Sequence, residues 1–227
     1  MRGSPNIPKR IKYASNLTIL LVFLIKTTCA SAAEGDITYI SVLKFSAGIV
    51  TAFTIHEGAH ALVAELTGTD LNWEIGNYNQ PIAFTEHASS GEKGVAINSA
   101  GLVSQTIGSE IILQSDKIDK NDEFVRGMMA WNIMNPISYA LDYWFIHRSN
   151  KKNGNTYQGD IQGIEYYTNE PTAHGFALSM ASIAVFQGYR FLKTQSWAPD
   201  WFKSRSCTVN FGPLSCGGLV MTYKVAF

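Results

Sequence analysis

The chain of 227 residues carries 18 basic and 18 acidic side chains, so its formal net charge at pH 7 is zero. Such neutrality excludes the basic surface that nucleic-acid binding requires. Hydrophobic residues make up 46% of the chain, which excludes an intrinsically disordered protein. Charged residues make up only 16%, against roughly 25% in ordinary soluble domains, so the apolar residues face either a protein core or lipid.

The first 32 residues have the order of a secretory signal peptide. Basic residues precede an apolar run at 17–25, and Ala30, Ser31 and Ala32 then provide the small side chains that a signal peptidase recognises. We therefore expect residues 1–32 to form a signal peptide that is cleaved after Ala32. An uncleaved N-terminal anchor is the alternative, although the apolar run is short for a membrane crossing.

Four long apolar stretches follow, and each is about as long as a bilayer crossing. They cover residues 37–66, 94–113, 124–147 and 171–192, while the charged residues gather in the segments between them. Small and polar residues within the stretches can face one another inside a membrane bundle. We therefore predict a mainly α-helical fold over residues 33–195, a polytopic membrane bundle of about four helices. An exported soluble helical domain is the alternative, because the mean hydropathy is close to zero.

The first apolar stretch contains His56-Glu57-Gly58-Ala59-His60, which has the pattern H-E-x-x-H. In a helix, His56 and His60 lie one turn apart on the same face, so both imidazoles can bind one zinc ion. Glu57 is placed to accept a proton from a zinc-bound water molecule. Two histidines and a carboxylate are costly in an apolar helix unless they are used. A polar helix face with this spacing by accident is the alternative.

The last 32 residues predict a small β-hairpin. Short β-prone runs lie on both sides of Gly212-Pro213, and residues 219–227 alternate between apolar and other side chains. Cys207 and Cys216 flank the turn, and in an oxidising compartment such a pair forms a disulfide. We therefore expect residues 196–227 to be an exported β-hairpin tail. Two unpaired buried thiols are the alternative.

The motif and the segments after it resemble the site-2-protease-like intramembrane zinc metallopeptidases. In that family the motif helix is followed by a β-rich loop, a helix that opens with small residues, an Asn-Pro signature and an aspartate that completes the zinc site. The corresponding segments here are residues 71–84, residues 98–102, Asn135-Pro136 and Leu141-Asp142. The resemblance implies a membrane-embedded zinc peptidase with a short β-loop after the motif helix.

The resemblance offers two candidates for the third zinc ligand. Asp142 matches the family's Leu-Asp pair, and it continues a polar stripe on one helix face, but Tyr143 follows it where the family has glycine. Asp160 opens a new helical pattern, which is similar to the helix-initiating aspartate of the family. This placement favours Asp160, although capping of the helix alone also explains an aspartate there.

These patterns predict a zinc metallopeptidase that hydrolyses peptide bonds in or near a membrane. Zinc is the expected cofactor, with Glu57 as general base and Asn132 or Asn135 as donor to the oxyanion. The expected partners are membrane lipid and a membrane-protein or peptide substrate. The expected location is a membrane, the bacterial inner membrane with an exported C-terminal tail. Two alternatives stay open: a non-proteolytic or inactive membrane protein whose structural zinc site binds a client, and a soluble exported zinc metallopeptidase.

Overall fold

The computed structural model describes most of the chain after residue 37. The described residues are 38–73, 82–84, 88–147, 159–203, 207–213 and 219–225. The four strands are described by their backbone alone. The predicted signal peptide, residues 1–32, lies outside the described residues.

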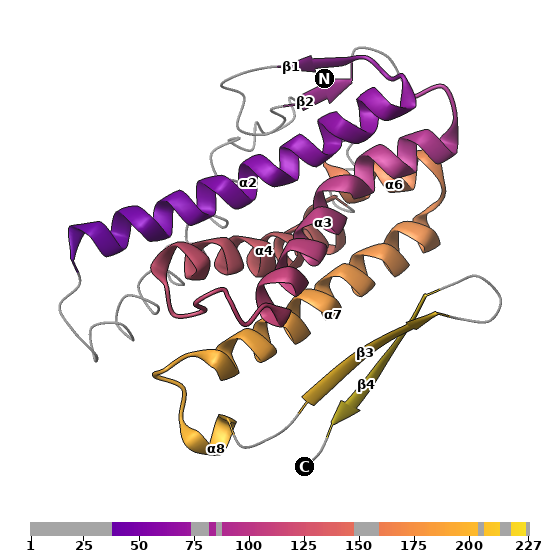
Figure 1. Cartoon of the computed structure of the whole chain (residues 1–227). Coiled ribbons are helices and arrows are strands. Elements are labelled where there is room, and N and C mark those ends of the chain that lie inside the picture. The colour runs from indigo at the N-terminus through magenta and orange to yellow at the C-terminus, as the bar shows by residue number, and fades with distance from the viewer. Residues whose placement is uncertain are drawn as a thin grey trace, which may run out of the picture. The chain divides into compact units, whose positions relative to one another are not determined.

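The described chain is mainly helical (Figure 1). In chain order the helices are α2 (Tyr39–Thr67), α3 (Gly91–Gln114), α4 (Glu123–Leu141), α6 (Asp160–Tyr167), α7 (Glu170–Thr194) and α8 (Asp200–Lys203). A π-helix, η1 (Asp142–His147), continues α4 without a break. Polar side chains cap the long helices at their start: Ser90 accepts a hydrogen bond from the backbone of α3, and Asp122 and Asn169 do the same for α4 and α7.

The predicted fold class, a polytopic bundle of about four membrane helices, is wrong. Among the described residues only α2 is long and apolar enough to cross a membrane. Helix α3, helix α4 together with η1, and helix α7 cover the other three apolar stretches, but polar residues interrupt them. Some of these residues pair between helices: Arg190 of α7 lies 2.5 Å from Glu110 of α3. By length and composition, these other helices therefore do not qualify as membrane spans.

Strand pairing is described in two places. β1 (Leu71–Trp73) pairs antiparallel with β2 (Ile82–Phe84), and β3 (Cys207–Pro213) pairs antiparallel with β4 (Leu219–Val225). In the second pair Cys207 lies opposite Val225. The predicted disulfide between Cys207 and Cys216 is not tested, because Cys216 lies outside the described residues.

Two glycines allow α2 and α4 to cross with their backbones in contact. A Cβ atom on Gly48 would overlap the carbonyl oxygen of Phe124, and one on Gly127 would overlap the carbonyl oxygen of Phe45. Farther along the same two helices, the ring of Phe53 meets that of Trp131 edge to face, with centroids 5.8 Å apart. The motif helix is thus held against α4 at a distance that larger side chains would not permit.

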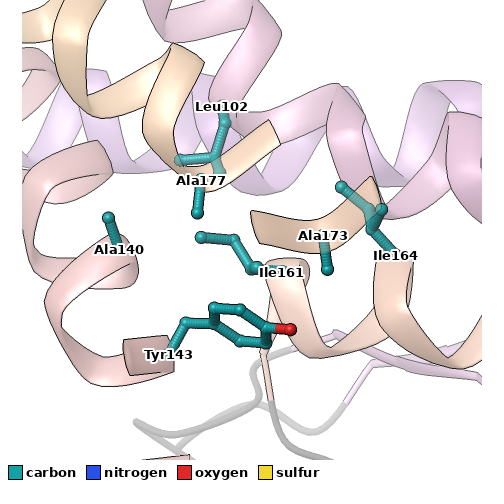
Figure 2. Close-up of a cluster of buried hydrophobic side chains, with 7 residues drawn as sticks. All are labelled: Leu102, Ala140, Tyr143, Ile161, Ile164, Ala173 and Ala177. Atoms are coloured by element: carbon teal, nitrogen blue, oxygen red, sulfur yellow. The ribbon is translucent and has the colours of Figure 1, made fainter. Parts of the chain in front are cut away.

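A hydrophobic cluster holds α6 in place (Figure 2). Ile161 and Ile164 of α6 are fully buried in it, beside Leu102 of α3, Tyr143 of η1 and Ala177 of α7. Burial of a side chain of this size contributes about 1.5–3 kcal/mol. Because Asp160 directly precedes Ile161, this packing determines where the first residue of α6 lies.

Candidate metal centre

Two histidines of α2 turn into the protein interior. His56 and His60 are 2% and 8% exposed, and their Nε2 atoms lie 3.2 Å apart. Their separation of four residues places both rings on one helix face. Glu57, the intervening motif residue, is half-buried on the same helix. The exposed residues of α2 are chiefly apolar, so these histidines form its buried polar part.

The carboxylate of Asp160 joins the two histidines from α6. Its Oδ2 atom lies 3.3 Å from Nε2 of His56 and 3.4 Å from Nε2 of His60. Gly159, which precedes it, has a φ of 120°, a conformation that an L side chain rarely adopts. The turn at Gly159 therefore allows α6 to begin with its first carboxylate beside the motif helix.

The three ligand atoms have the spacing that a tetrahedral metal ion requires. A zinc ion about 2.0–2.1 Å from each nitrogen or oxygen ligand places those ligands about 3.3 Å from one another. The three observed separations are 3.2, 3.3 and 3.4 Å. The buried group of His56, His60 and Asp160 could therefore hold a metal ion.

The hydrogen bonds of the group favour a cation at its centre. Nδ1 of His60 lies 2.6 Å from the carbonyl oxygen of Ile97. Since a carbonyl can only accept, Nδ1 carries the hydrogen and a neutral His60 presents a lone pair at Nε2. Among the described residues, Oδ2 of Asp160 has no hydrogen-bond donor besides the imidazoles of His56 and His60. Lone pairs that converge in a buried site repel one another unless a cation, either a metal ion or the proton of a charged imidazole, lies between them.

Electrostatics keep Asp160 in the form that binds metal. Burial alone raises the pKa of Asp160, but without a metal ion the positive charge of protonated His60 and His56 and their hydrogen bonds to the carboxylate lower it more. The pKa of Asp160 is therefore below its usual value of 3.8. The carboxylate is ionised near neutral pH, as a metal ligand must be.

Two further residues complete the walls of the group. Gly101 of α3 faces both imidazoles, and a Cβ atom there would overlap the rings of His56 and His60. The ring of Tyr139 of α4 stacks on His56, with centroids 6.1 Å apart and an angle of 27° between the planes. Nδ1 of His56 has no hydrogen-bond partner among the described residues, so packing orients this ring.

The other predicted site residues lie outside this group. Asp142 accepts a hydrogen bond from another side chain, Gln162, at 3.0 Å. Asn135 donates to Gln105, one turn along α3 from Gly101, at 3.0 Å. Asn132 is buried beside Gly108, about 10 Å along α3 from Gly101. The described contacts thus place both asparagines in the helix interface.

Sequence reasoning missed several contacts of the group. Gly101 belongs to the small-residue segment 98–102, which was noted for its composition and not for contact with the histidines. Tyr139 precedes Asp142 by three residues on the same helix face, but its ring contact with His56 needs two helices in place. The carbonyl group of Ile97 carries no sequence signal, because every residue has one.

Comparison with models of known protein families, with curated proteins and with solved structures gives no match.

Proposed function

We propose that this protein is a zinc-dependent peptidase in which His56, His60 and Asp160 hold the ion and Glu57 is the general base. The observation that carries the proposal is the tetrahedral spacing of the three ligand atoms, next to the glutamate of an H-E-x-x-H helix. The same motif gives the chain its resemblance to the site-2-protease-like metallopeptidases.

Ligand chemistry and spacing favour zinc. Two imidazoles and one carboxylate suit zinc, and they also suit the ferrous ion of oxygenases with two histidines and one carboxylate. An octahedral ion with ligands about 2.1 Å away would place adjacent ligands about 3.0 Å apart. The three observed separations, 3.2–3.4 Å, are closer to the tetrahedral value.

The number of ligands favours a catalytic site over a structural one. Structural zinc sites have four protein ligands, whereas catalytic sites have three and leave one position for water or substrate. Across the part of the chain that the structure describes, the group contains three candidate ligands, His56, His60 and Asp160. This supports a hydrolase over a protein that only retains a client.

Each residue of the group has a distinct role in the proposed reaction. A bound zinc ion supplies Lewis acidity, which makes water more acidic and polarises the carbonyl group of the substrate. Glu57 accepts the proton of the attacking water and returns it to the leaving amine. The bond from His60 to the carbonyl of Ile97 keeps Nε2 free to bind metal. Gly101 leaves the space that both imidazoles occupy.

The surroundings of the group support a substrate at a membrane. Only 22% of the most apolar part of α2 is buried inside the protein. The core helix of a soluble protein is mostly buried. Val50, Leu62 and Leu66 of this helix are each at least 60% exposed. We propose that α2 contacts lipid in a cell membrane and that the substrate is a peptide segment in or beside that membrane.

The test compares metal content and hydrolysis in matched variants. The full chain is purified in detergent with zinc, its bound metals are measured by mass spectrometry, and cleavage of a set of fluorogenic peptides is followed. Glu57→Gln should keep its zinc and lose activity by a factor of at least about 100, because only the general base is removed. His60→Ala should lose both its bound zinc and its activity. Glu65→Gln, on the exposed side of the same helix, should keep both.

Three results would overturn the proposal. Full hydrolysis by Glu57→Gln would exclude the assigned base. If both metals are offered and the purified protein binds one iron ion per chain and no zinc, the assigned metal would be excluded. Full zinc content without cleavage of any peptide, in detergent or in vesicles, would leave the structural alternative in its place.

A further inference from the structure

A hydrogen bond links the half-buried side chain of Asp142 to α6. Nε2 of Gln162 donates to Oδ2 of Asp142 at 3.0 Å. Asp142 is the first residue of the π-helix η1, and Gln162 lies in the first turn of α6. Gln162 is only 3% exposed. The bond therefore connects the end of α4 to the turn that carries Asp160.

The amide of Gln162 also covers the backbone just before Asp160. Its Oε1 atom lies 2.7 Å from the position that a Cβ atom on Gly159 would occupy. The backbone of Gly163 donates to the carbonyl of Gly159 at 3.0 Å, which closes the first turn of α6 around this amide. A rotation of the Gln162 side chain would therefore disturb the turn from which the Asp160 carboxylate projects.

Helix α6 needs such a link. It has eight residues, and no side chain caps its start at Gly159. Isolated helices of this length are not stable in water, so contacts with other elements must hold α6 in place. Apolar packing at Ile161 and Ile164 holds one face of α6, and packing of this kind tolerates small rotations. A hydrogen bond is directional, and it restricts the rotation that would move Asp160 away from the histidines.

We propose that Asp142 is a positioning residue that acts through Gln162 to keep the carboxylate of Asp160 at the metal group. The inference rests on metal binding by His56, His60 and Asp160, the first part of the proposed function. It assigns the two aspartates different tasks: Asp160 binds the ion, and Asp142 orients the turn that presents Asp160. Removal of a residue that orients a metal ligand in this way typically weakens metal affinity about 10–100-fold.

The test measures zinc affinity by competition with a chromogenic chelator, and the thermal unfolding of the metal-free protein alongside. Asp142→Asn keeps an oxygen that accepts from Gln162, so its dissociation constant for zinc should stay within about threefold of wild type. Asp142→Leu removes the acceptor and should raise the constant about 10–100-fold. Asp160→Asn removes an anionic ligand and should weaken binding more than Asp142→Leu does.

A double-mutant cycle separates positioning from general stability. Gln162→Met keeps the volume of the side chain and removes the donor, and should weaken zinc binding as Asp142→Leu does. The double variant should be no weaker than either single variant, since both changes remove the same bond. Gln162→Met also serves as the primary variant if Asp142→Leu does not fold.

Several outcomes would overturn the inference. Loss of zinc by Asp142→Asn, to the extent seen for Asp160→Asn, would make Asp142 a ligand. Unchanged affinity in Asp142→Leu or Gln162→Met would remove the positioning role while leaving the metal group intact. Additive effects in the double variant would show that the two residues act separately. A wild-type protein that binds no zinc would overturn both this inference and the proposed function.

Discussion

Nδ1 of His60 donates its hydrogen to the carbonyl oxygen of Ile97, 2.6 Å away on the neighbouring helix α3. The bond determines which nitrogen of His60 is free, and it directs that nitrogen toward His56 and Asp160. It also joins the motif helix to α3 close to Gly101, where the two backbones leave room for the imidazoles. The packing of α3 on α2 therefore determines the geometry of the metal group.

Gly101→Ala should abolish zinc binding while Gly58→Ala should not. A Cβ atom at position 101 overlaps the rings of His56 and His60, whereas a Cβ atom at position 58 meets nothing within 4 Å. The dissociation constant for zinc is measured for both variants. We expect at least about a 100-fold increase for Gly101→Ala and none for Gly58→Ala, because displaced ligands cannot keep their geometry. Equal affinities would contradict the close approach of α3 to the histidines.

Gly127→Ala should destabilise the fold, in contrast to the same change at Gly175. The added methyl group at position 127 overlaps the backbone oxygen of Phe45, and at position 175 it meets open space. We expect a loss of about 1–3 kcal/mol or more in the free energy of unfolding for Gly127→Ala. Gly175→Ala lies within helix α7 and should gain about 0.5–1 kcal/mol. Urea unfolding followed by circular dichroism measures both, and similar stabilities would exclude the glycine crossing of α2 and α4.

Ser109→Ala should stabilise the protein. Ser109 is fully buried in α3, and its hydroxyl group has no hydrogen-bond partner among the described residues. Removal of an unsatisfied buried hydroxyl should raise the free energy of unfolding by about 1 kcal/mol. The control is Ser104→Ala on the same helix, whose hydroxyl donates to the carbonyl of Gly101 at 2.7 Å and which should bring no such gain. A loss of stability in Ser109→Ala would show that the hydroxyl is satisfied by water.

The ion pair between Lys44 and Asp122 should contribute to stability only above acidic pH. The hydrogen bond from Lys44, 3.0 Å long, holds the pKa of Asp122 below its usual 3.8. A carboxyl group with a lowered pKa in the folded state stabilises the fold above its unfolded pKa, and this contribution is lost as the pH falls through the folded pKa. Asp122→Asn keeps an oxygen that caps α4, so it reports on the charge alone.

The melting temperatures of wild type and Asp122→Asn are compared from pH 7 to pH 2. Their difference should be constant down to about pH 5, should shrink as the pH falls past the usual carboxyl pKa of 3.8, and should disappear once the pH is below the lowered pKa of folded Asp122. It should be small at any pH and smaller still in high salt, because the pair is solvent-exposed. A difference that is unchanged at pH 2 would mean that Asp122 stabilises the fold by something other than its charge.

Local sequence patterns were sufficient for the helices and for two of the three candidate metal ligands. The four apolar stretches all contain helices, and the spacing of His56 and His60 places two ligands on one face without any other part of the fold. The number of membrane spans was predicted wrongly. Composition shows how apolar a stretch is, but the pairing of residues such as Glu110 with Arg190 depends on which helices pack together.

Tertiary structure decided between the two aspartates. Asp142 and Asp160 lie 82 and 100 positions after His60 in the chain. No spacing rule relates residues so far apart to one helix face. Only the docking of α6, through Ile161 and Ile164, brings Asp160 to the histidines and leaves Asp142 bonded to Gln162. The chain by itself determined the two histidines and Glu57, because one helical turn is a local property. The third candidate ligand, Asp160, depended on the fold, because long-range contacts place it.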